Sequence, residues 1–418
     1  MASSVTSGVG THQKLLRARH AASITAQLSS VEKNSLLREM SAALESGQAS
    51  VLDANRIDLE LSGLVGAMRD RLLLTQERIG EIARALREVA NLPDPVGETL
   101  RQCHRPNGLV IRKVRVPLGV LGVIYESRPN VTVDTVALAL KTGNAIVLRG
   151  GREAAHSNRR LVEILTGVEG VPEGAVELLD SSTRDSVGDL IRARGLVDVL
   201  IPRGGAELIR YVTENAMVPV IETGAGNCHI FIDEAADFAM ADRIVLNAKT
   251  QRPSVCNAAE KLLVHRSIAA KYIPRIVGKL LEHGVEVRGD EEACLLALRQ
   301  DVRLAETEDW TEEYLRLCIA IRVVEDMDEA ILHINRHSTR HSEAIITSDE
   351  TRAQRFLRQI DSAVVYWNAS TRFTDGGEFG FGAEMGVSTQ KLHCRGPFAL
   401  EELTSTKYEV IGQGHVRG

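Results

Sequence analysis

A single cysteine stands on a segment that the sequence places between a helix and a strand. The stretch from Asn247 to His265 is typical of a helix that ends before Pro253, followed by Cys256 and an apolar strand. A thiol on such a loop is held in place yet can be reached by a ligand, as nucleophilic attack on a carbonyl carbon requires. Lys249 and Arg252 are close in sequence, and we expect their charges to favour the thiolate. The alternative is that Cys256 is a small buried hydrophobic residue, as free cysteines usually are.

Size and composition narrow the classes of protein to consider. With 418 residues, the chain is long for one core and predicts two domains or one large α/β unit. A net charge of −6 without a basic stripe argues against nucleic acid as a partner. The six cysteines are scattered, which argues against a disulfide framework or a metal site and predicts reduced thiols in the cytoplasm. No secretory signal and no apolar run of about 20 residues is present, so we expect a soluble protein without a membrane partner.

Two series of alternating elements must position the cysteine. Helical spacing of apolar residues predicts helices from about Lys14 to Ser46 and from about Asp70 to Asn91. Near-continuous apolar runs separated by helical segments then predict a parallel sheet covered on both faces. These runs are Gly119–Tyr125, Ala145–Arg149, Ala175–Asp180, Leu196–Pro202 and Val218–Thr223. After Ile230 a second series begins, which includes the cysteine loop; its stretch from Gly289 to Glu313 is acidic and predicts surface.

A hairpin interrupts this order. Pro106-Asn107-Gly108 lies between two runs with alternating polar residues and predicts a β-turn. The second run carries Arg112, Lys113 and Arg115, too much charge for a core strand. Such a projecting hairpin can pair through its edges with another subunit, and a solvated hairpin in a monomer is the alternative. A strand at Tyr408–Gly412 could likewise dock on a neighbour.

Three features follow the carboxyl ends of the predicted strands, where ligands of parallel sheets bind. Glu126–Asn130 follows the first strand, Arg149-Gly150-Gly151 the second and Arg203-Gly204-Gly205 the fourth. The last opens a helix over 206–214, whose N–H groups could hold a phosphate. None is a complete dinucleotide fingerprint, and glycine turns that merely end strands are the alternative. Together they predict a nucleotide, and Arg149, with no carboxylate before Glu153, favours NADP.

Several blocks resemble a known family. The runs Pro117–Asn130 and Lys141–Gly151 resemble the aldehyde dehydrogenase superfamily. Thr250–Cys256, His337–Ala344 and Asn368–Gly382 resemble, more narrowly, its branch that acts in proline synthesis. The resemblance covers essentially the whole chain and implies an aldehyde-dehydrogenase-like α/β fold, with two Rossmann-type parallel-sheet domains plus a β-hairpin oligomerisation element. By this resemblance, residues 1–99 and 117–229 bind NADP, residues 230–395 carry the nucleophilic cysteine, and residues 100–116 and 396–418 form the oligomerisation hairpin and tail.

The resemblance also implies an activity: NADPH reduces L-glutamate 5-phosphate to glutamate 5-semialdehyde and phosphate, the second step of proline synthesis. Cys256 would displace phosphate to give a thioester, which hydride then reduces. The backbone N–H of Cys256 and the side chain of Asn130 are candidate donors to the oxyanion. The alternative for Asn130 is a structural role, as a turn residue after Pro129. The implied enzyme stands alone, without a fused kinase domain, as a homo-oligomer with a glutamate 5-kinase as a partner.

The remaining candidates concern the substrate and the cofactor. Glu222 stands where hydrolytic aldehyde dehydrogenases carry the glutamate that activates water. A reductase that releases phosphate does not need this water, so we interpret Glu222 as structural or close to the cofactor. A hydrolytic dehydrogenase with Glu222 as the base is one rival function, and a non-catalytic protein of the same fold is another. The cofactor contacts are assigned to Arg149, Gly150, Gly151, Gly204, Gly205 and Glu222.

The expected substrate carries an α-carboxylate and a phosphoryl group. Both favour the forked guanidinium of arginine. Arg128, Arg252 and Arg372 are the arginines inside the blocks, and for each a structural salt bridge is an equal alternative.

Overall fold

The computed structural model describes residues 10–183 and 185–417 and divides into two compact units. Unit 1 comprises Met1–Glu222, Gly380–Gly386 and Phe398–Gly418, and unit 2 comprises Thr223–Phe379 and Val387–Pro397. The division thus follows residue 222, compared with residue 229 in the sequence-based scheme. It also places the hairpin and most of the tail in unit 1.

Unit 1 contains helices α1 to α9 and a four-stranded parallel sheet. The helices are α1 (Thr11–Thr25), α2 (Ser30–Ser46), α3 (Gln48–Ser62), α4 (Gly66–Leu72), α5 (Gln76–Asn91), α6 (Pro129–Lys141), α7 (Ala155–Thr166), α8 (Asp185–Ile191) and α9 (Ala206–Asn215), with a 3-10 turn η1 (Arg152–Ala154) before α7. The strands are β3 (Val120–Tyr125), β4 (Ala145–Arg149), β5 (Val176–Leu178) and β6 (Val199–Arg203), in the order β5-β4-β3-β6.

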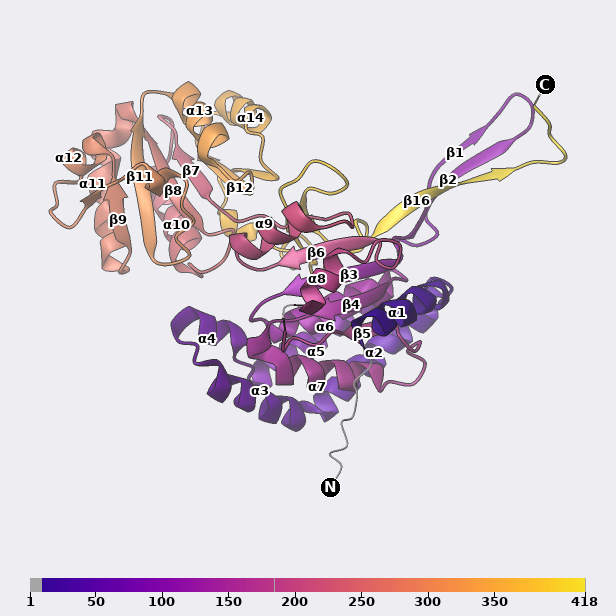
Figure 1. Ribbon diagram of the computed structural model, residues 1–418. Helices are drawn as coiled ribbons and strands as arrows, with labels where there is room; N and C mark the ends of the chain where they lie inside the picture. Colours follow the sequence, from indigo (N-terminus) through magenta and orange to yellow (C-terminus); the bar gives the residue numbers. More distant parts are fainter. Residues whose placement is uncertain (1–9, 184, 418) are drawn as a thin grey trace. The chain divides into compact units, whose positions relative to one another are not determined.

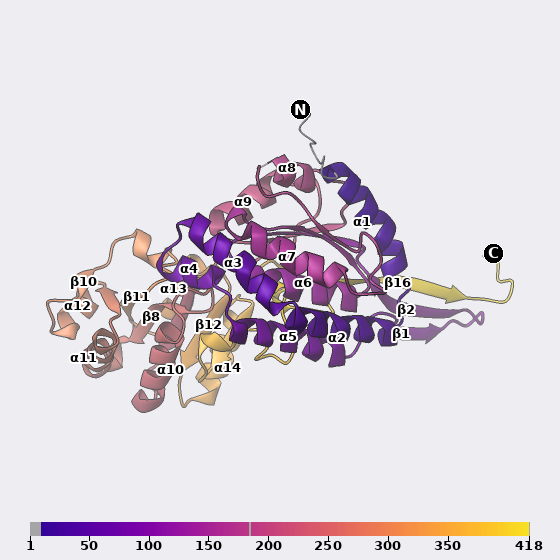
Figure 2. The same ribbon diagram turned by 90° about the horizontal axis from the view of Figure 1, so that it is seen from below.

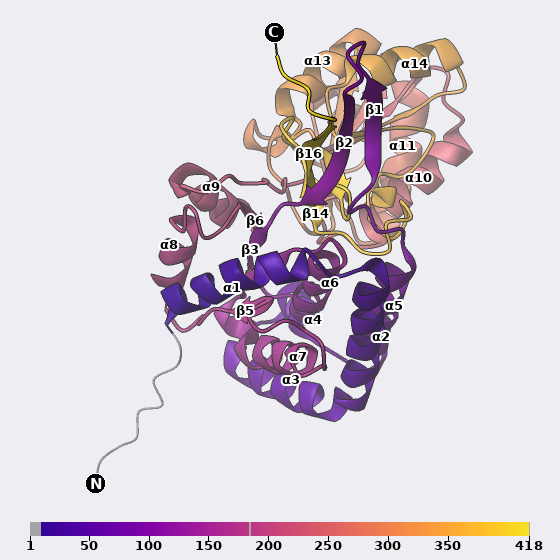
Figure 3. The same ribbon diagram turned by 90° about the vertical axis from the view of Figure 1, so that its right-hand side faces the viewer.

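Helices cover both faces of this sheet, as its apolar strands require. Helices α1, α8 and α9 share one apolar core with β3, β4 and β6, formed by residues such as Leu15, Val147 and Leu190. Helices α6 and α7 cover the opposite face, and α2, α3 and α5 pack outside them (Figures 1 and 3). The antiparallel pair α2 and α5 runs side by side (Figure 2).

The predicted hairpin is confirmed. Strands β1 (Thr99–His104) and β2 (Val110–Pro117) pair antiparallel, and β16 (Thr404–Ile411) pairs with the other edge of β2. The three strands extend away from the parallel sheet of unit 1 (Figure 1). Tyr408 and Val410 of β16 are exposed although they are large and apolar.

Unit 2 is built on a seven-stranded parallel sheet in the order β10-β9-β11-β8-β7-β12-β13. Its strands are β7 (Cys228–Ile232), β8 (Ala259–His265), β9 (Glu286–Gly289), β10 (Arg303–Leu304), β11 (Cys318–Val324), β12 (Ser342–Ile346) and β13 (Val364–Trp367). Its helices are α10 (Phe238–Thr250), α11 (Arg266–Glu282), α12 (Glu291–Ala297), α13 (Met327–His337) and α14 (Glu350–Gln359), with 3-10 turns η2 (Glu308–Trp310) and η3 (Thr371–Phe373). Helices α10, α11 and α12 pack on one face of this sheet and form an apolar core with it. Helices α13 and α14 do the same on the other face (Figure 1). Strands β14 (Gly386–Ser388) and β15 (Gly396–Phe398) form a two-stranded sheet.

The helical stretches of the sequence-based scheme are confirmed, and one expected strand is wrong. The predicted helical stretch Lys14–Ser46 is divided between α1 and α2, because Ser29 caps the start of α2 with a capping box to Glu32. The stretch Val218–Thr223 makes only isolated bridges rather than a strand. Pro219 lies within it and has no N–H to donate, so a continuous ladder along β6 cannot form.

A buried ion pair connects α2 with the turn after α5. The ammonium of Lys33 lies 2.8 Å from Asp94, and the two side chains are only 1% and 6% exposed. We expect Asp94→Ala to lower the free energy of unfolding by about 3–5 kcal/mol, because Lys33 would keep its charge in a buried place without its partner. Urea denaturation followed by circular dichroism measures the change.

The control is Glu45→Ala, which breaks the exposed pair between Arg87 and Glu45. This variant should lose at most about 1 kcal/mol. Equal losses of unfolding free energy in the two variants would show that the buried Lys33–Asp94 pair matters no more to stability than the exposed pair.

Candidate active site

The cysteine loop has the predicted location. Asp237 is the N-cap residue of helix α10, its carboxylate accepts the N–H of Met240 at 2.6 Å, and the helix ends at Thr250. Cys256 follows on the loop to β8 and is partly exposed, whereas Cys228 and Cys318 are buried. The interpretation of Cys256 as a small core residue is therefore wrong, and a thiol within reach of a ligand remains.

Arg372 connects the glycine-rich loop after β13 to the cysteine loop. Its guanidinium donates to the side-chain oxygens of Gln251, at 2.9 Å, and Asn257. Asn257 in turn donates to the carbonyl of Thr374 at 2.9 Å, and its own carbonyl accepts the hydroxyl of Thr371 at 2.7 Å. Residues on both sides of Cys256 are thus held by the loop that carries Arg372.

The structure brings three of the candidate residues into electrostatic contact. Burial is the main reason that the pKa of Arg372 falls below its usual value; the charge of Arg252 lowers it further, and Cys256 raises it. Arg252 is exposed, so its guanidinium faces water. Arg372 is therefore the cation whose hydrogen bonds join it to the cysteine loop, and the charges of Arg252 and Cys256 both act on it.

Lys249 does not have the expected role. Its ammonium is fully buried and lies 2.7 Å from the equally buried carboxylate of Glu260. Burial lowers the pKa of Lys249 and raises that of Glu260 to about 7. A charge paired in this way cannot also favour the Cys256 thiolate, so Arg252 and Arg372 are the cations that remain for it.

Glu313 contributes a contact that sequence reasoning missed. Its carboxylate accepts the N–H of Gly226 at 2.7 Å across 87 residues of sequence. A Cβ atom at Gly226 would overlap the carbonyl oxygen of Cys256, so only glycine allows this approach. The expectation that Gly289–Glu313 is simply acidic surface is wrong for Glu313, and no local pattern separates it from its exposed neighbour Glu312.

In unit 1, Asn130 lies in the first turn of α6, which begins at Pro129 with Arg128 as its N-cap residue. The side-chain amide of Asn130 donates to Asp134 at 3.1 Å. Burial is the main cause that raises the pKa of Asp134 to about 6. Asn130 is thus a helix residue rather than the turn residue of the alternative reading, and one of its two N–H groups is used locally.

The loop before α6 is held by a carboxylate. Glu153 accepts both the backbone N–H and the hydroxyl of Ser127, at 2.6 and 2.7 Å. Ser127 has a φ of 43°, which is unusual for a residue with a side chain. The first carboxylate after Arg149 is therefore engaged with this loop.

Arg149 is fixed at the end of β4. Its guanidinium donates to the carbonyls of Gly150 and Thr183, at 3.1 and 2.9 Å, and to the hydroxyl of Ser186 at 3.4 Å. At Gly150 a Cβ atom would overlap the side-chain amide of Asn158. The Gly150-Gly151 turn is therefore needed for close packing, in addition to any role toward a ligand.

A cavity of about 880 Å³ lies next to this turn, within unit 1. Gly150, Asn158, Arg159 and Asp180 are among the residues that line it, at the carboxyl ends of β4 and β5. Asn158 is 1% exposed, and its amide nitrogen has no hydrogen-bond partner among residues 10–183 and 185–417. An orphaned buried donor beside a cavity is a place for a ligand acceptor.

The N-terminus of α9 carries a carboxylate where the sequence predicts a phosphate. Glu126 accepts the N–H of Gly205 at 2.9 Å, and Gly204 leaves room for this carboxylate. The N–H groups of the next three residues have no acceptor within the helix. Glu222 follows Ile221, whose N–H donates to the carbonyl of Leu200 in β6 at 2.8 Å.

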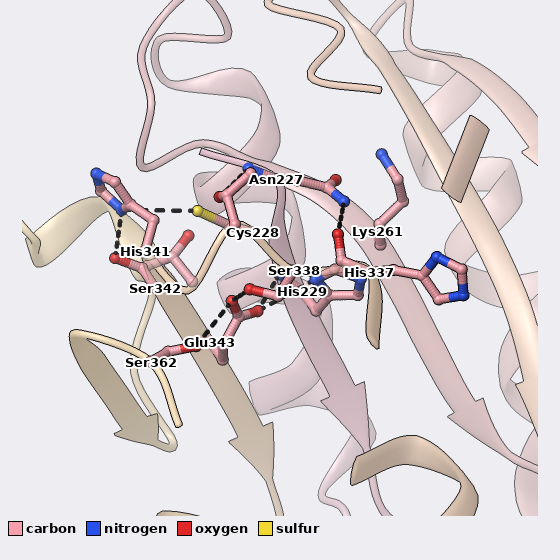
Figure 4. Close-up of polar contacts among 12 residues, drawn as sticks. Asn227, Cys228, His229, Lys261, His337, Ser338, His341, Ser342, Glu343 and Ser362 are labelled. Carbon is pink, nitrogen blue, oxygen red and sulfur yellow. Dashed lines mark hydrogen bonds and ion pairs between the residues drawn. The ribbon is translucent and has the colours of Figure 1, made fainter. Parts of the chain in front are cut away.

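A buried carboxylate lies deeper in unit 2, between β7 and β12 (Figure 4). Glu343 is fully buried and accepts the backbone N–H of His229 at 2.7 Å and the hydroxyls of Ser338 and Ser362. Burial is the main cause that raises its pKa to about 8. Between its usual pKa near 4.5 and 8, the native chain therefore retains a proton that the unfolded chain releases.

Unit 2 should consequently lose stability as pH rises through this window, by up to about 1.4 kcal/mol per pH unit from this group. We expect Glu343→Gln to reduce that slope. Urea denaturation between pH 5 and 8, followed by tryptophan fluorescence, measures it, since Trp310 and Trp367 both belong to unit 2. Glu350→Gln, at an exposed position of α14, is the control and should retain the slope. An unchanged slope in Glu343→Gln would show that another group causes it.

Comparison with known proteins gives consistent results. The model of the aldehyde dehydrogenase family matches residues 11–316 and 305–408. The chain is 66% identical over 407 residues to a gamma-glutamyl phosphate reductase of Koribacter versatilis, covering 97% of this chain and 100% of the relative. It is 54% identical to the enzyme of that name from Moorella thermoacetica, covering 96% and 97% of the two chains.

Solved structures agree. The crystal structure of gamma-glutamyl phosphate reductase from Thermotoga maritima superposes with a TM-score of 0.94 at 48% identity, covering 98% of this chain and 100% of the other. A propionaldehyde dehydrogenase from Clostridium phytofermentans shares the fold, with a TM-score of 0.71 at 17% identity over 97% and 98% of the chains. None of the helices in residues 10–183 and 185–417 has the length and apolar character to cross a bilayer.

Proposed function

Because the chain belongs to the aldehyde dehydrogenase family, and within it to the gamma-glutamyl phosphate reductases, we propose that it reduces L-glutamate 5-phosphate to L-glutamate 5-semialdehyde and phosphate with NADPH, in the second step of proline synthesis. The observation that carries this proposal is the partly exposed Cys256 on a loop that Arg372 holds on both sides of it, through Gln251 and Asn257. In this proposal unit 1 binds the cofactor and unit 2 carries the nucleophile.

Cys256 performs the covalent steps. Its thiolate attacks the acyl carbon, the bond from this carbon to the phosphate oxygen breaks, and phosphate leaves with the electron pair. Bound NADPH supplies the hydride that reduces the resulting thioester. The thiohemiacetal oxyanion then collapses, the carbon–sulfur bond breaks, and the thiolate of Cys256 is restored as the aldehyde leaves. No general base acts on water in this sequence, so Glu222 has no catalytic part in it.

Donors and cations must stabilise the charge that develops on the substrate. The backbone N–H of Cys256 serves the carbonyl oxygen as an oxyanion donor. Asn130 is our second candidate, through the N–H that Asp134 does not accept. For the α-carboxylate and the phosphoryl group we propose Arg128, Arg252 and Arg372, whose guanidinium groups suit such anions.

The residues of unit 1 fit a dinucleotide. The 880 Å³ cavity at the carboxyl ends of β4 and β5, with the orphaned amide of Asn158, suits its adenosine part. Gly150, Gly151, Gly204 and Gly205 would let the cofactor approach the backbone. For the diphosphate to reach the N–H of Gly205, the carboxylate of Glu126 must release it.

We propose NADP rather than NAD because of individual side chains, although the lining of this cavity also includes carboxylates such as Asp180 and Asp185. Glu153 is engaged with Ser127 and is not directed at a ribose. Arg149 contributes positive charge at the end of β4, although its donors hold backbone carbonyls. Arg159 lines the cavity and is exposed, so it is the guanidinium that we propose for the 2′-phosphate.

We expect Arg159→Ala to raise the KM for NADPH about 10-fold or more, because a charge-assisted hydrogen bond is lost, and to leave the KM for NADH unchanged. Steady-state rates with the two cofactors measure this difference. Arg160→Ala is the matched control: its guanidinium binds Ser50 and Glu163. An equal rise for both cofactors would remove Arg159 from this role.

The oxidative direction tests the reaction itself. With NADP and glutamate 5-semialdehyde, we expect NADPH to form continuously only when phosphate is present, because, after one NADPH per active site, phosphate must discharge the thioester. Turnover without phosphate would instead indicate a hydrolytic dehydrogenase with Glu222 as the base.

Cys256→Ser should lose nearly all turnover and still bind NADPH, as measured by a thermal shift. Substantial activity in this variant would refute the assigned role of Cys256.

We further propose that the enzyme is a cytoplasmic homo-oligomer. The sheet of β1, β2 and β16 leaves an edge strand and the apolar side chains of Tyr408 and Val410 exposed, as expected for a surface that a second copy covers. A kinase that phosphorylates the γ-carboxylate of glutamate must supply the substrate, and a glutamate 5-kinase is the proposed partner.

A further inference from the structure

The segment Gly226–His229 lies directly against the nucleophile loop. The thiol of Cys228, at the start of β7, donates to the carbonyl oxygen of Cys256 at 3.1 Å. Gly226 packs its backbone against the same carbonyl. The peptide that follows the nucleophile is therefore held from one side by two residues of a single segment.

The block His337–Glu343 holds this segment in turn. This block is a sequence motif that the proposed reaction does not use directly. The backbone N–H of Asn227 donates to the hydroxyl of Thr339 and its side-chain amide to the carbonyl of His337, both at 2.9 Å. The N–H of His229 donates to Glu343 at 2.7 Å (Figure 4).

Cys228 itself faces a histidine of the same block. Its sulfur lies 3.9 Å from Nδ1 of His341, which is within 2.8 Å of the hydroxyl of Ser342 (Figure 4). Cys228, His341 and Ser342 are all fully buried. The sulfur is thus enclosed between this block and the nucleophile loop.

We propose that Cys228 is a positioning residue for the nucleophile: its thiol fixes the carbonyl of Cys256, and with it the direction of the Cys256 side chain. The block His337–Glu343 acts through this contact, by holding residues 227–229 in place. The inference rests on the proposed role of Cys256 as the nucleophile.

The surroundings keep the Cys228 thiol neutral. Burial raises its pKa well above the usual value, and the carboxylates of Glu343, Glu313 and Glu260, together with Cys256, raise it further. A neutral thiol can donate a hydrogen bond and is a poor nucleophile. Cys228 therefore supports Cys256 without competing for the substrate.

The contact matters because the rate of attack depends on geometry. A nucleophile must meet the acyl carbon along a narrow range of directions, and a small displacement costs rate without weakening the binding of the cofactor. Loss of the Cys228 donor should consequently change kcat and the reactivity of Cys256, with little effect on the KM for NADP.

Three variants of the full chain test the proposal. Cys228→Ala removes the donor, Cys228→Ser replaces it by a hydroxyl, and Cys318→Ala truncates another buried cysteine of the same sheet, in β11. For each variant we would measure kcat and KM in the phosphate-dependent oxidation of glutamate 5-semialdehyde. The rate at which iodoacetamide alkylates Cys256 would be followed across pH by mass spectrometry, and thermal melting would report stability.

In Cys228→Ala we expect kcat and the alkylation rate of Cys256 to fall about 3- to 10-fold, the equivalent of one hydrogen bond. Cys228→Ser should recover most of both losses, and Cys318→Ala should show neither. If Cys228→Ala does not fold, Cys228→Val, which fills the space without a donor, takes its place with the same expectation.

A parental kcat and alkylation profile in Cys228→Ala, or an equal loss in Cys318→Ala, would overturn the proposal. Failure of the proposed function has a different signature. If Cys256 is not the nucleophile, Cys256→Ser retains turnover. The difference in the alkylation rate of Cys256 between the parent chain and Cys228→Ala still reports the contact between the two cysteines.

Discussion

The close approach of the Gly226 backbone to the carbonyl of Cys256 is the contact on which the reactive part of unit 2 depends. A nucleophile must be reachable by its substrate, so its loop cannot be buried among apolar side chains. Backbone packing and hydrogen bonds therefore have to fix the loop. Glu313 anchors Gly226 from one side, and Arg372 and Asn257 hold the loop from the other.

Buried ionisable groups support this arrangement at a cost in stability. The pair Lys249–Glu260 and the carboxylate of Glu343 lie in the interior of unit 2, where desolvation is unfavourable. Each is close in space to β7 or β8, the strands next to the nucleophile loop. Hydrogen bonds to buried carboxylates specify one geometry more strictly than apolar packing does, because their partners must have the correct direction. This gives a physical reason to place such groups beneath a loop that must not shift.

Carboxylates have a comparable part in unit 1. Glu153 holds Ser127 in an unusual backbone conformation, and Glu126 accepts the first N–H at α9. Both acidic residues are thus used to organise loops at the carboxyl edge of the sheet. In the proposed function the ribose and phosphates of the cofactor are recognised by other groups, and Asn158 and Arg159, which line the cavity, are our candidates.

The sequence by itself determines the elements and the position of the loop that carries Cys256. Helical spacing, apolar runs and turn residues are local signals, so the strands β3 and β4, the hairpin at Pro106–Gly108 and the loop of Cys256 could be predicted. The same blocks of residues, through their resemblance to known proteins, also indicated the family that the comparisons identify.

Only the tertiary structure decided how polar side chains are paired. Glu313 reaches Gly226 across 87 residues, Cys228 reaches Cys256 across 28, and Arg149 is held by Thr183 across 34. Lys249 looked like a cation for the nucleophile because it is near Cys256 in sequence, yet its ammonium is turned into the core and bound to Glu260. Sequence spacing describes which residues share an element, whereas the partner of a charge depends on how separate elements pack, and that is a property of the folded chain alone.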